Sequence, residues 1–324
     1  MSGGARDGAG EESGCPRVRP RRLRPGDRVA IVAPSGPVDQ LRLEAGCDRL
    51  RGLGFEVAVG KRSLDRVTLA GSADGPPAWQ RLAGSDADRA ADLCDAWCDP
   101  DVRAVLCARG GYGATRILGR LDWTALAAAD PKILHGSSDI TALHVAFGRR
   151  LGITTSFGPM VAGLVAGGET RSMVHLKAAL SGGGAPVRGT HAIARGRARG
   201  VLTGGNLSLL TALLGTPHAP PPAAGAIAFL EDVAEAPYRV DRMLTQLLQA
   251  GWFDDVAGIA LGTWTGCGDP AELDGVLASR LGRIGVPVLA GLPVGHGPTQ
   301  LTVELGGMVD LDADGGVLTP GGDR

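Results

Sequence analysis

The segment "HGSSD", residues 135–139, places two adjacent serines where an apolar run gives way to a helical pattern. Ser and Asp are favoured caps of a helix, so Ser137 or Ser138 could accept a main-chain N–H bond there. A serine on such a turn could equally be a nucleophile, because its Oγ would lie at the positive end of the helix dipole. The hydrolase pattern Gly-x-Ser-x-Gly is not matched, since Ile140 stands at the second glycine position. The turn by itself leaves both roles open for Ser138.

A serine nucleophile needs a base that accepts its proton. His296, in "GLPVGHGPTQ", stands between Gly295 and Gly297 at a predicted strand end. Glycine neighbours leave the imidazole room to project into a cleft, although a surface-loop histidine is the simpler interpretation. His144 lies about one and a half turns into the helix predicted after Ser138, too far along it to reach back. His296 is therefore the candidate base.

A third group must orient the base, and carboxylates follow an apolar strand in "AIAFLEDVAE". Glu231 and Asp232 end this run, and Glu235 follows. A carboxylate at a buried strand end can be held rigidly. The order Ser138, acid, His296 is one of the known triad orders, but geometry and not order defines a triad.

The turn "RGGYG", residues 109–113, is the second segment that could do chemistry. Gly110, Gly111 and Gly113 carry no β-carbon, so their N–H groups could converge on an oxyanion. A phosphate cradle is matched less well, because the Gly-Lys-Ser/Thr of a P-loop and the G-x-G-x-x-G spacing are both missing. A plain tight turn is the third interpretation.

The elements that must position these residues alternate along the first half of the chain. The predicted strands lie in "RVAIVAPSGPV", "FEVAVG", "RAVLCARGGYG", "KILHG" and "ITTSFGPM". The predicted helices lie in "LRLEAGCDRLRGLG", "SDADRAADLCDAWC", "ATRILGRLDWTALAA" and "SDITALHVAFGRRLG". This alternation predicts an open, parallel α/β sheet, in which ligands bind beyond the carboxyl ends of the strands. "RGGYG" and "HGSSD" both follow predicted strands.

The character of the sequence changes near Gly163, where glycine-rich breaks begin. We predict a solvated, disordered tail over residues 1–22 and an α/β domain over 23–165 that carries the nucleophile. A linker region over 166–195 would lead to a smaller, mainly β domain over 196–324, which carries the acid and the base. Two helices are predicted in that domain, in "NLSLLTALLG" and "PYRVDRMLTQLLQAG".

The composition excludes several functional classes. A formal net charge of −1 and 4% aromatic residues give little to attract or stack a nucleic acid. The six cysteines have no paired C-x-x-C spacing, which indicates thiols in a reducing cytosol and no metal site. No apolar run approaches the roughly 18 residues that span a bilayer. We expect a soluble protein of two domains.

Six blocks of the sequence, in this order, resemble the LD-carboxypeptidase family of serine peptidases, which also includes the microcin-immunity peptidases. The blocks are "VAIVAPSGPV", "RGGYGATRIL", "PKILHGSSDITALH", "GVLTGGNLSLLTALLGTP", "FLEDVAEAPYRVDRML" and "LPVGHGP". They span the chain from about Gly26 to Val317. The resemblance implies an α/β N-terminal half, a mainly β C-terminal half and a homodimer.

The resemblance implies a Ser-Glu-His triad without metal or other cofactor. Carried onto matching positions, the nucleophile is Ser138, the acid is Glu231 and the base is His296. Glu235 is less expected as the acid, because the triad glutamate comes first in its block. The family usually has a tyrosine where Ser137 stands, so Ser138 and not Ser137 aligns with the nucleophile.

The resemblance also assigns the groups around the triad. The oxyanion hole would combine the Asp139 N–H with one from the turn at Gly110 and Gly111. A carboxypeptidase must bind a free carboxylate, for which Arg109 is the best-placed cation, although a structural ion pair would explain it too. The family often has a histidine where "SFGPM" has Phe157, which bears on substrate contacts from that loop.

The implied substrate is a murein tetrapeptide that loses its terminal D-alanine during cytoplasmic cell-wall recycling, with no nucleic acid or membrane partner. One alternative is a microcin-immunity-like peptidase that cleaves a peptidyl or aminoacyl nucleotide, which would need an aromatic clamp for the base. The other is a non-catalytic α/β protein that binds a small ligand at "RGGYG". It would not require Ser138, Glu231 and His296 to converge.

Overall fold

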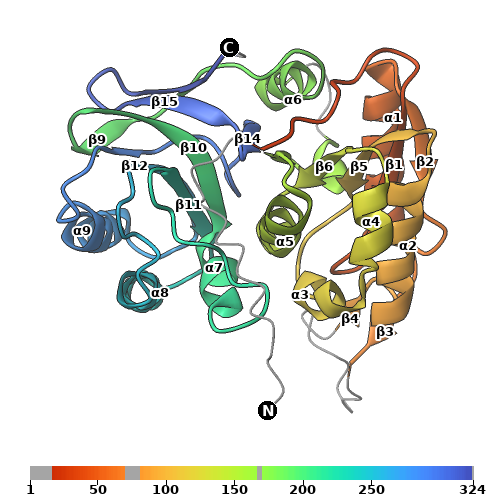
Figure 1. Cartoon of the computed structure of the whole chain (residues 1–324), viewed down its shortest axis with the longest axis horizontal. Coiled ribbons are helices and arrows are strands. Elements are labelled where there is room, and N and C mark those ends of the chain that lie inside the picture. Colours follow the sequence, from red (N-terminus) through yellow and green to blue (C-terminus); the bar gives the residue numbers. More distant parts are fainter. Residues whose placement is uncertain (1–16, 70–80, 166–169, 323–324) are drawn as a thin grey trace, which may run out of the picture.

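The computed structural model describes residues 17–69, 81–165 and 170–322. Its N-terminal half is built on a six-stranded sheet of order β14-β7-β6-β5-β1-β2 (Figure 1). The strands are β1 (Arg28–Val32), β2 (Glu56–Val59), β5 (Val102–Cys107), β6 (Ile133–Gly136), β7 (Thr155–Phe157) and β14 (Val303–Leu305). All pair in parallel except β14, which comes from the far end of the chain and runs antiparallel to β7.

Helices cover both faces of this sheet (Figure 1). They are α1 (Gln40–Gly52), α2 (Asp86–Cys98), α3 (Ala114–Ile117), α4 (Trp123–Ala128), α5 (Thr141–Leu151) and α6 (Arg171–Ser181). Side chains of β1 alternate between the two faces: Val29 and Ile31 join the core with α1 and α6, whereas Ala30 and Val32 join the core with α2 and α5. Burial on both faces explains why the strands read as continuous apolar runs. A short hairpin, β3 (Val67–Thr68) with β4 (Arg81–Leu82), lies apart from this sheet.

The C-terminal half is an eight-stranded mixed sheet of order β8-β16-β15-β10-β11-β12-β13-β9. Its strands are β8 (Val187–Arg188), β9 (His191–Ala194), β10 (Arg197–Asn206), β11 (Ile227–Val233), β12 (Gly258–Thr265), β13 (Val288–Ala290), β15 (Met308–Asp312) and β16 (Val317–Pro320). The two edge strands β8 and β9 are separated in sequence by only Gly189 and Thr190, so the sheet must curl until its edges approach. Its helices are α7 (Leu207–Leu213), α8 (Pro237–Gln249) and α9 (Pro270–Leu281).

The two halves share one hydrophobic core. Buried side chains of α5 pack in the same cluster as those of α7, β11 and β12, and α5 lies between the two sheets (Figure 1). Phe157 of β7 meets Phe229 of β11 edge to face, with ring centroids 5.2 Å apart. This common packing therefore positions both β6, which precedes Ser138, and β11, which carries Glu231.

The predicted fold class is confirmed: a parallel α/β sheet precedes a curled, mainly β sheet. The single helix predicted in "ATRILGRLDWTALAA" was wrong, because the chain forms α3, a 3₁₀ turn over Leu118–Arg120, and α4. Asp122 accepts N–H bonds from Thr124 and Ala125 and so starts a new helix. The count of two helices in the second half was also wrong. It missed α9, which Asp269 caps ahead of Pro270.

The predicted tail was too long. Residues 1–16 lie outside the described part, but Val18 pairs with Ile153 in a parallel bridge, and Arg19 forms an ion pair with Glu304. The division at 165 and 195 stays a prediction. Within 166–195, α6 packs on the N-terminal core, while β8 and β9 belong to the C-terminal sheet.

Gly204 of β10 offers a test of the close pairing between β10 and β11. A β-carbon there would lie 2.0 Å from the Phe229 carbonyl oxygen, at a φ of +126°. We expect Gly204→Ala to lower the free energy of unfolding by at least about 3 kcal/mol in urea denaturation. Gly215→Ala is the control: its φ is +75° with nothing within 4 Å, so it should cost only about 1 kcal/mol. Equal losses would contradict this account of the strand pair.

Candidate active site

Ser138 lies on a sharp turn between β6 and α5. β6 ends at Gly136, and Ser138 opens a 3₁₀ turn with a φ of 60°, in the left-handed region that a residue with a side chain rarely adopts. A β-carbon on Gly136 would lie 3.1 Å from Cβ of Cys107, so only glycine lets the turn start this close to β5. Strain of this kind is held in place by surrounding structure and is characteristic of functional sites. The side chain of Ser138 is partly exposed.

The carboxylate of Asp139 fixes this turn. It is buried, and its Oδ2 accepts hydrogen bonds from Ser35 Oγ at 2.6 Å and from the N–H of Ala114 at 2.7 Å. Asp139 therefore caps α3 and not its own helix, and Ser137 makes no side-chain capping bond. The prediction that Ser137 or Ser138 caps a helix was wrong. The side chain of this segment that accepts a main-chain N–H bond is that of Asp139, and the donor lies in the segment that follows β5. Ser35 was not singled out from the sequence.

Arg89 of α2 completes the brace beneath the turn. Its side chain is buried, and its guanidinium donates to the carbonyl oxygens of Pro34 and of Gly113, the latter at 2.9 Å, and pairs with Asp86. Two loops that follow β1 and β5 are thus tied to one helix. Nothing in the sequence points to this role, since a charged residue on a helix is usually exposed.

The glycine turn after β5 lies directly against Ser138. A β-carbon on Gly110 would be 3.1 Å from Ser138 Cβ and 3.4 Å from its Oγ. The carbonyl of Gly110 accepts a hydrogen bond from the N–H of Gly36, which fixes the turn. Within the described residues, the N–H groups of Gly110 and Gly111 donate to no acceptor. They are available to an oxyanion near Ser138 Oγ.

Glu231 and His296 form a hydrogen-bonded pair. Glu231, on β11, is 0% exposed, and its Oε2 lies 2.7 Å from His296 Nδ1. His296 belongs to the loop after β13, six residues beyond the strand end, and not to a strand end as predicted. A β-carbon on Gly295, whose φ is +124°, would lie 2.5 Å from Glu231 Oε2, so glycine is needed for the loop to pass over the carboxylate.

Asn206 holds the other oxygen of Glu231. It ends β10, and its Nδ2 donates to Glu231 Oε1 at 3.2 Å and to Asp232 Oδ1 at 2.9 Å. Its own N–H donates to Thr141 Oγ1 at 3.0 Å, at the start of α5. Asn206 thus connects the acid to the helix that follows Ser138. The sequence contained one signal for it, an isolated polar side chain ending the apolar strand in "GVLTGGN".

The pKa of His296 lies above its ordinary value. Burial alone lowers it, but the hydrogen bond and the charge of Glu231 raise it by more. His135 and His144 differ, because complete burial lowers the pKa of each to about 4. Both ring nitrogens of His135 and Nε2 of His144 bond to neighbours within the core. Glu235 pairs with Arg239 at 2.8 Å, away from His296.

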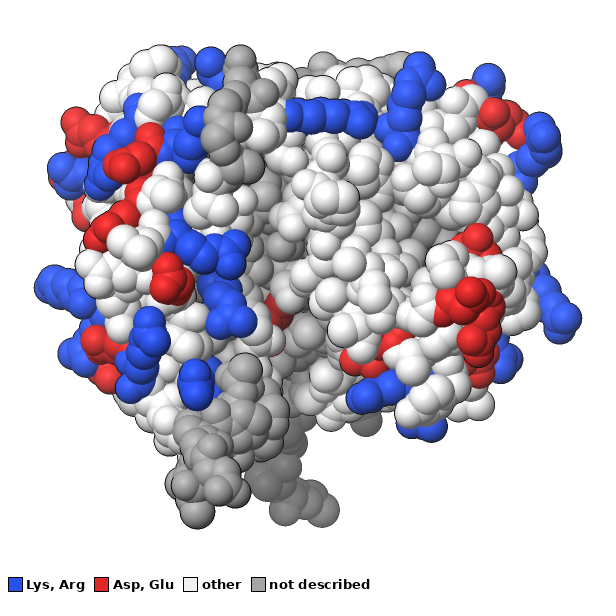
Figure 2. All heavy atoms as spheres, turned by 180° about the vertical axis from the view of Figure 1, so that it is seen from behind, with Lys and Arg blue, Asp and Glu red and all other residues white. Residues whose placement is uncertain are grey.

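Ser138 and His296 line one cavity of about 650 Å³, a volume in the range of ligand-binding sites. Its wall includes four arginines, the glycine turn and Met160, and Figure 2 shows the hollowed face between the two halves. No hydrogen bond between Ser138 and His296 is present among the described residues. Such contacts are often long before substrate binds. Arg109 lines the same cavity and donates to the carbonyl of Pro37 at 2.8 Å.

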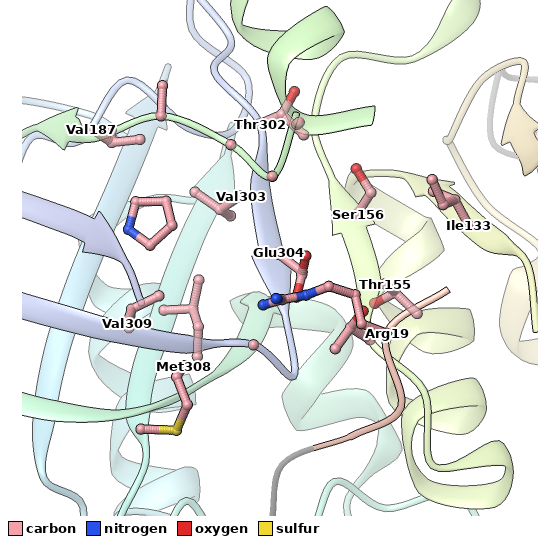
Figure 3. A pocket seen from close by; sticks show the side chains of 18 of the residues that line it. Arg19, Ile133, Thr155, Ser156, Val187, Thr302, Val303, Glu304, Met308 and Val309 are labelled. Carbon is pink, nitrogen blue, oxygen red and sulfur yellow. The ribbon is translucent and has the colours of Figure 1, made fainter. Parts of the chain in front are cut away.

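A second cavity, of about 60 Å³, lies at the junction of β7, β14 and β15 (Figure 3). Thr155, Thr302 and Val303 line it, and the ion pair of Arg19 and Glu304 lies beside it. It has room for a few water molecules and none for a peptide. None of the candidate catalytic residues lines it.

Within the described ranges, no group of three or more His, Cys, Asp or Glu side chains is arranged to hold a metal ion. The helices of the same ranges are too short or too polar to cross a membrane.

Substitution of Glu231 by Gln tests the electrostatic pairing. The variant keeps the burial of His296 but removes the neighbouring charge, so we expect the imidazole pKa to fall below 6.5. An NMR titration of the ring signals measures it. Glu235→Gln, which removes a carboxylate that pairs with Arg239, should leave the titration of His296 unchanged. A raised pKa in Glu231→Gln would show that another group sets the protonation of His296.

Two family models match the chain. The LD-carboxypeptidase N-terminal domain matches residues 29–158, and the LD-carboxypeptidase C-terminal domain matches residues 199–311. A putative carboxypeptidase of Streptomyces coelicolor is 51% identical over 311 residues, covering 93% of this chain and 96% of its own length. The murein tetrapeptide carboxypeptidase of Pseudomonas aeruginosa is 35% identical over 289 residues, covering 83% of this chain and 88% of its own.

Solved structures give the same result. The muramoyltetrapeptide carboxypeptidase of Oxalobacter formigenes has a TM-score of 0.75 at 28% identity, covering 90% of this chain and 97% of its own. The microcin C7 self-immunity protein, in complex with aspartyl sulfamoyl adenosine, has a TM-score of 0.79 at 24% identity, covering 94% and 99%, and shares the fold. With both halves matched in order, the chain belongs to the LD-carboxypeptidase family of serine peptidases.

Proposed function

We propose that the protein removes the terminal D-alanine from a murein tetrapeptide, with Ser138 as nucleophile, His296 as base and Glu231 as the acid that orients it. The observation that carries the proposal is the buried Glu231–His296 pair, whose imidazole lines the same cavity as Ser138 on its left-handed turn. The names of the relatives from Pseudomonas aeruginosa and Oxalobacter formigenes support the substrate.

The geometry supports the following steps. Because Nδ1 of His296 is bonded to Glu231, Nε2 is the nitrogen that takes the proton of Ser138 Oγ as this oxygen attacks the peptide carbonyl. The oxyanion would receive N–H bonds from Asp139 and from the turn at Gly110 and Gly111, each donor being worth about 3 kcal/mol in the barrier.

The intermediate collapses when His296 gives the proton to the leaving amine of D-alanine, and an acyl ester remains on Ser138. Water then attacks this ester with His296 again as base. The Oγ–carbon bond breaks, the tripeptide leaves with a new carboxylate, and Ser138 regains its proton. Glu231 stabilises the imidazolium in both halves of the reaction without itself becoming protonated.

The released residue carries a free carboxylate, which needs a cation near Ser138. Arg109 immediately precedes Gly110, the residue that faces the Ser138 side chain, and its guanidinium is exposed to the cavity. Its bond to the Pro37 carbonyl uses one of five N–H groups. We assign Arg109 to this carboxylate.

The microcin-immunity-like activity is the competing function. It would require a ring to stack on the nucleobase. Among the described residues that line the cavity there is no Phe, Trp or Tyr. The murein peptide is favoured on this ground. A cytoplasmic location and a homodimer stay predictions from the family resemblance.

The adjacent serines provide a matched pair of variants. We expect Ser138→Ala to lower kcat for D-alanine release from murein tetrapeptide by a factor of about 10⁴ or more, because no oxygen remains to form the ester. Ser137→Ala should keep kcat within about tenfold, since Ser137 lines the cavity but makes no capping bond. Chromatography of tripeptide and D-alanine measures both.

Retained turnover in Ser138→Ala would overturn the assigned nucleophile. Cleavage of a peptidyl nucleotide together with no release of D-alanine from murein tetrapeptide would instead assign the competing function. Melting curves of both variants should match the wild type, because each change removes a single hydroxyl near the surface of the cavity.

A further inference from the structure

Of the four arginines that line the cavity, three form no ion pair with a carboxylate among the described residues. Elsewhere in the described chain, arginines such as Arg62 and Arg280 pair with aspartates. Among the same residues, Arg42, Arg66 and Arg109 make no ion pair, and each donates a hydrogen bond only to a main-chain carbonyl: those of Ala162, Val38 and Pro37. These contacts orient the guanidinium groups without neutralising them.

All three are arranged around one short segment, residues 37–42. Arg109 binds the carbonyl of Pro37, Arg66 binds the next carbonyl, and Arg42 lies in the first turn of α1. Arg81 lines the same cavity. Asp39 is the one acidic side chain of the wall, and its Oδ1 accepts the N–H of Arg42 as the cap of α1. The cavity therefore carries a clear excess of positive charge, although the whole chain has a formal net charge of −1.

We infer that Arg42 and Arg66 form a second anion subsite, for a carboxylate of the peptide upstream of the bond that is cut. The inference rests on the proposed function, in which Arg109 takes the terminal carboxylate. One cation is enough for that terminal group, so further cations call for further anions on the ligand. A peptide whose third residue is diaminopimelate has such a carboxylate beside its side-chain amine, whereas lysine at this position has the amine alone and offers the arginines no anion.

A nucleotide phosphate is the other anion that these arginines could bind. The wall formed by the described residues has no aromatic ring to stack a base, which favours the peptide carboxylate. Arginine suits either anion because its planar fork binds two oxygens at once. The two sources differ in the remainder of the ligand and are separated by the substrates used in the test.

Three tetrapeptides of equal length test the subsite: one with diaminopimelate as third residue, one with the side-chain carboxylate of that residue amidated, and one with lysine. For the wild type we expect kcat/KM to be at least about tenfold higher on the first than on either other peptide, mostly through KM. In the double variant Arg42→Gln/Arg66→Gln this preference should shrink to less than about threefold. Turnover of the lysine peptide should change little, which also shows that the variant folds.

Arg120→Gln is the matched control, because Arg120 is exposed and does not line the cavity. It should keep the full preference. Equal turnover of the three peptides by the wild type, or an equal loss on all three in the double variant, would overturn the subsite while D-alanine release still supported the proposed function. No release from any peptide would reject the proposed function itself. Arginine-dependent cleavage of a peptidyl nucleotide alone would assign the subsite to phosphate.

Discussion

The C-terminal half contains a carboxylate that is buried away from water, and the chain around it must supply its hydrogen bonds. Glu231 is 0% exposed, and burying an unpaired charge of this kind would cost several kcal/mol. Both of its oxygens are bonded, one to His296 and one to Asn206. The surrounding chain is fitted to it: the pairing of β11 with β12 shifts register beside Glu231, and Gly295 lets the His296 loop approach. Bulges and glycines at this point serve the site and not the sheet.

The same residues join this half to the nucleophile. Asn206 ends β10 beside Glu231, and its main chain is bonded to Thr141 at the start of α5. On the other side of the turn, Asp139 links Ser35 and Ala114, so the loops that follow β1 and β5 are bonded to the turn that carries Ser138. The shared core around α5 and the pairing of β14 with β7 hold the two sheets against each other. A site assembled from distant segments is thereby held together by hydrogen bonds and common packing.

Much of the first half could be predicted from the sequence. Each parallel strand is an apolar run ended by glycine or proline, and in each helix the apolar residues recur at helical spacing. The helix over Asp86–Cys98 begins after Ser85 and ends before Pro100, as the pattern indicates. The break after α3 was missed. Asp122 acts as a helix cap only because the chain turns before it, and the sequence pattern did not reveal that turn. The curled sheet was harder still, because the pairing of strands such as β8 and β16 depends on contacts distant in sequence.

The candidate site shows the same division. Ser138, Glu231 and His296 could be proposed from motifs, whereas Arg89, Ser35 and Asn206 act through bonds between loops that no spacing reveals.

The most direct measurement is a crystal structure of the protein with a peptidyl phosphonate that mimics the tetrahedral intermediate. We expect phosphorus bonded to Ser138 Oγ, its oxygen near the N–H groups of Gly110 or Gly111, and Nε2 of His296 within hydrogen-bond distance of Oγ. A bond to Ser137, or an imidazole turned away from Ser138, would contradict this expectation.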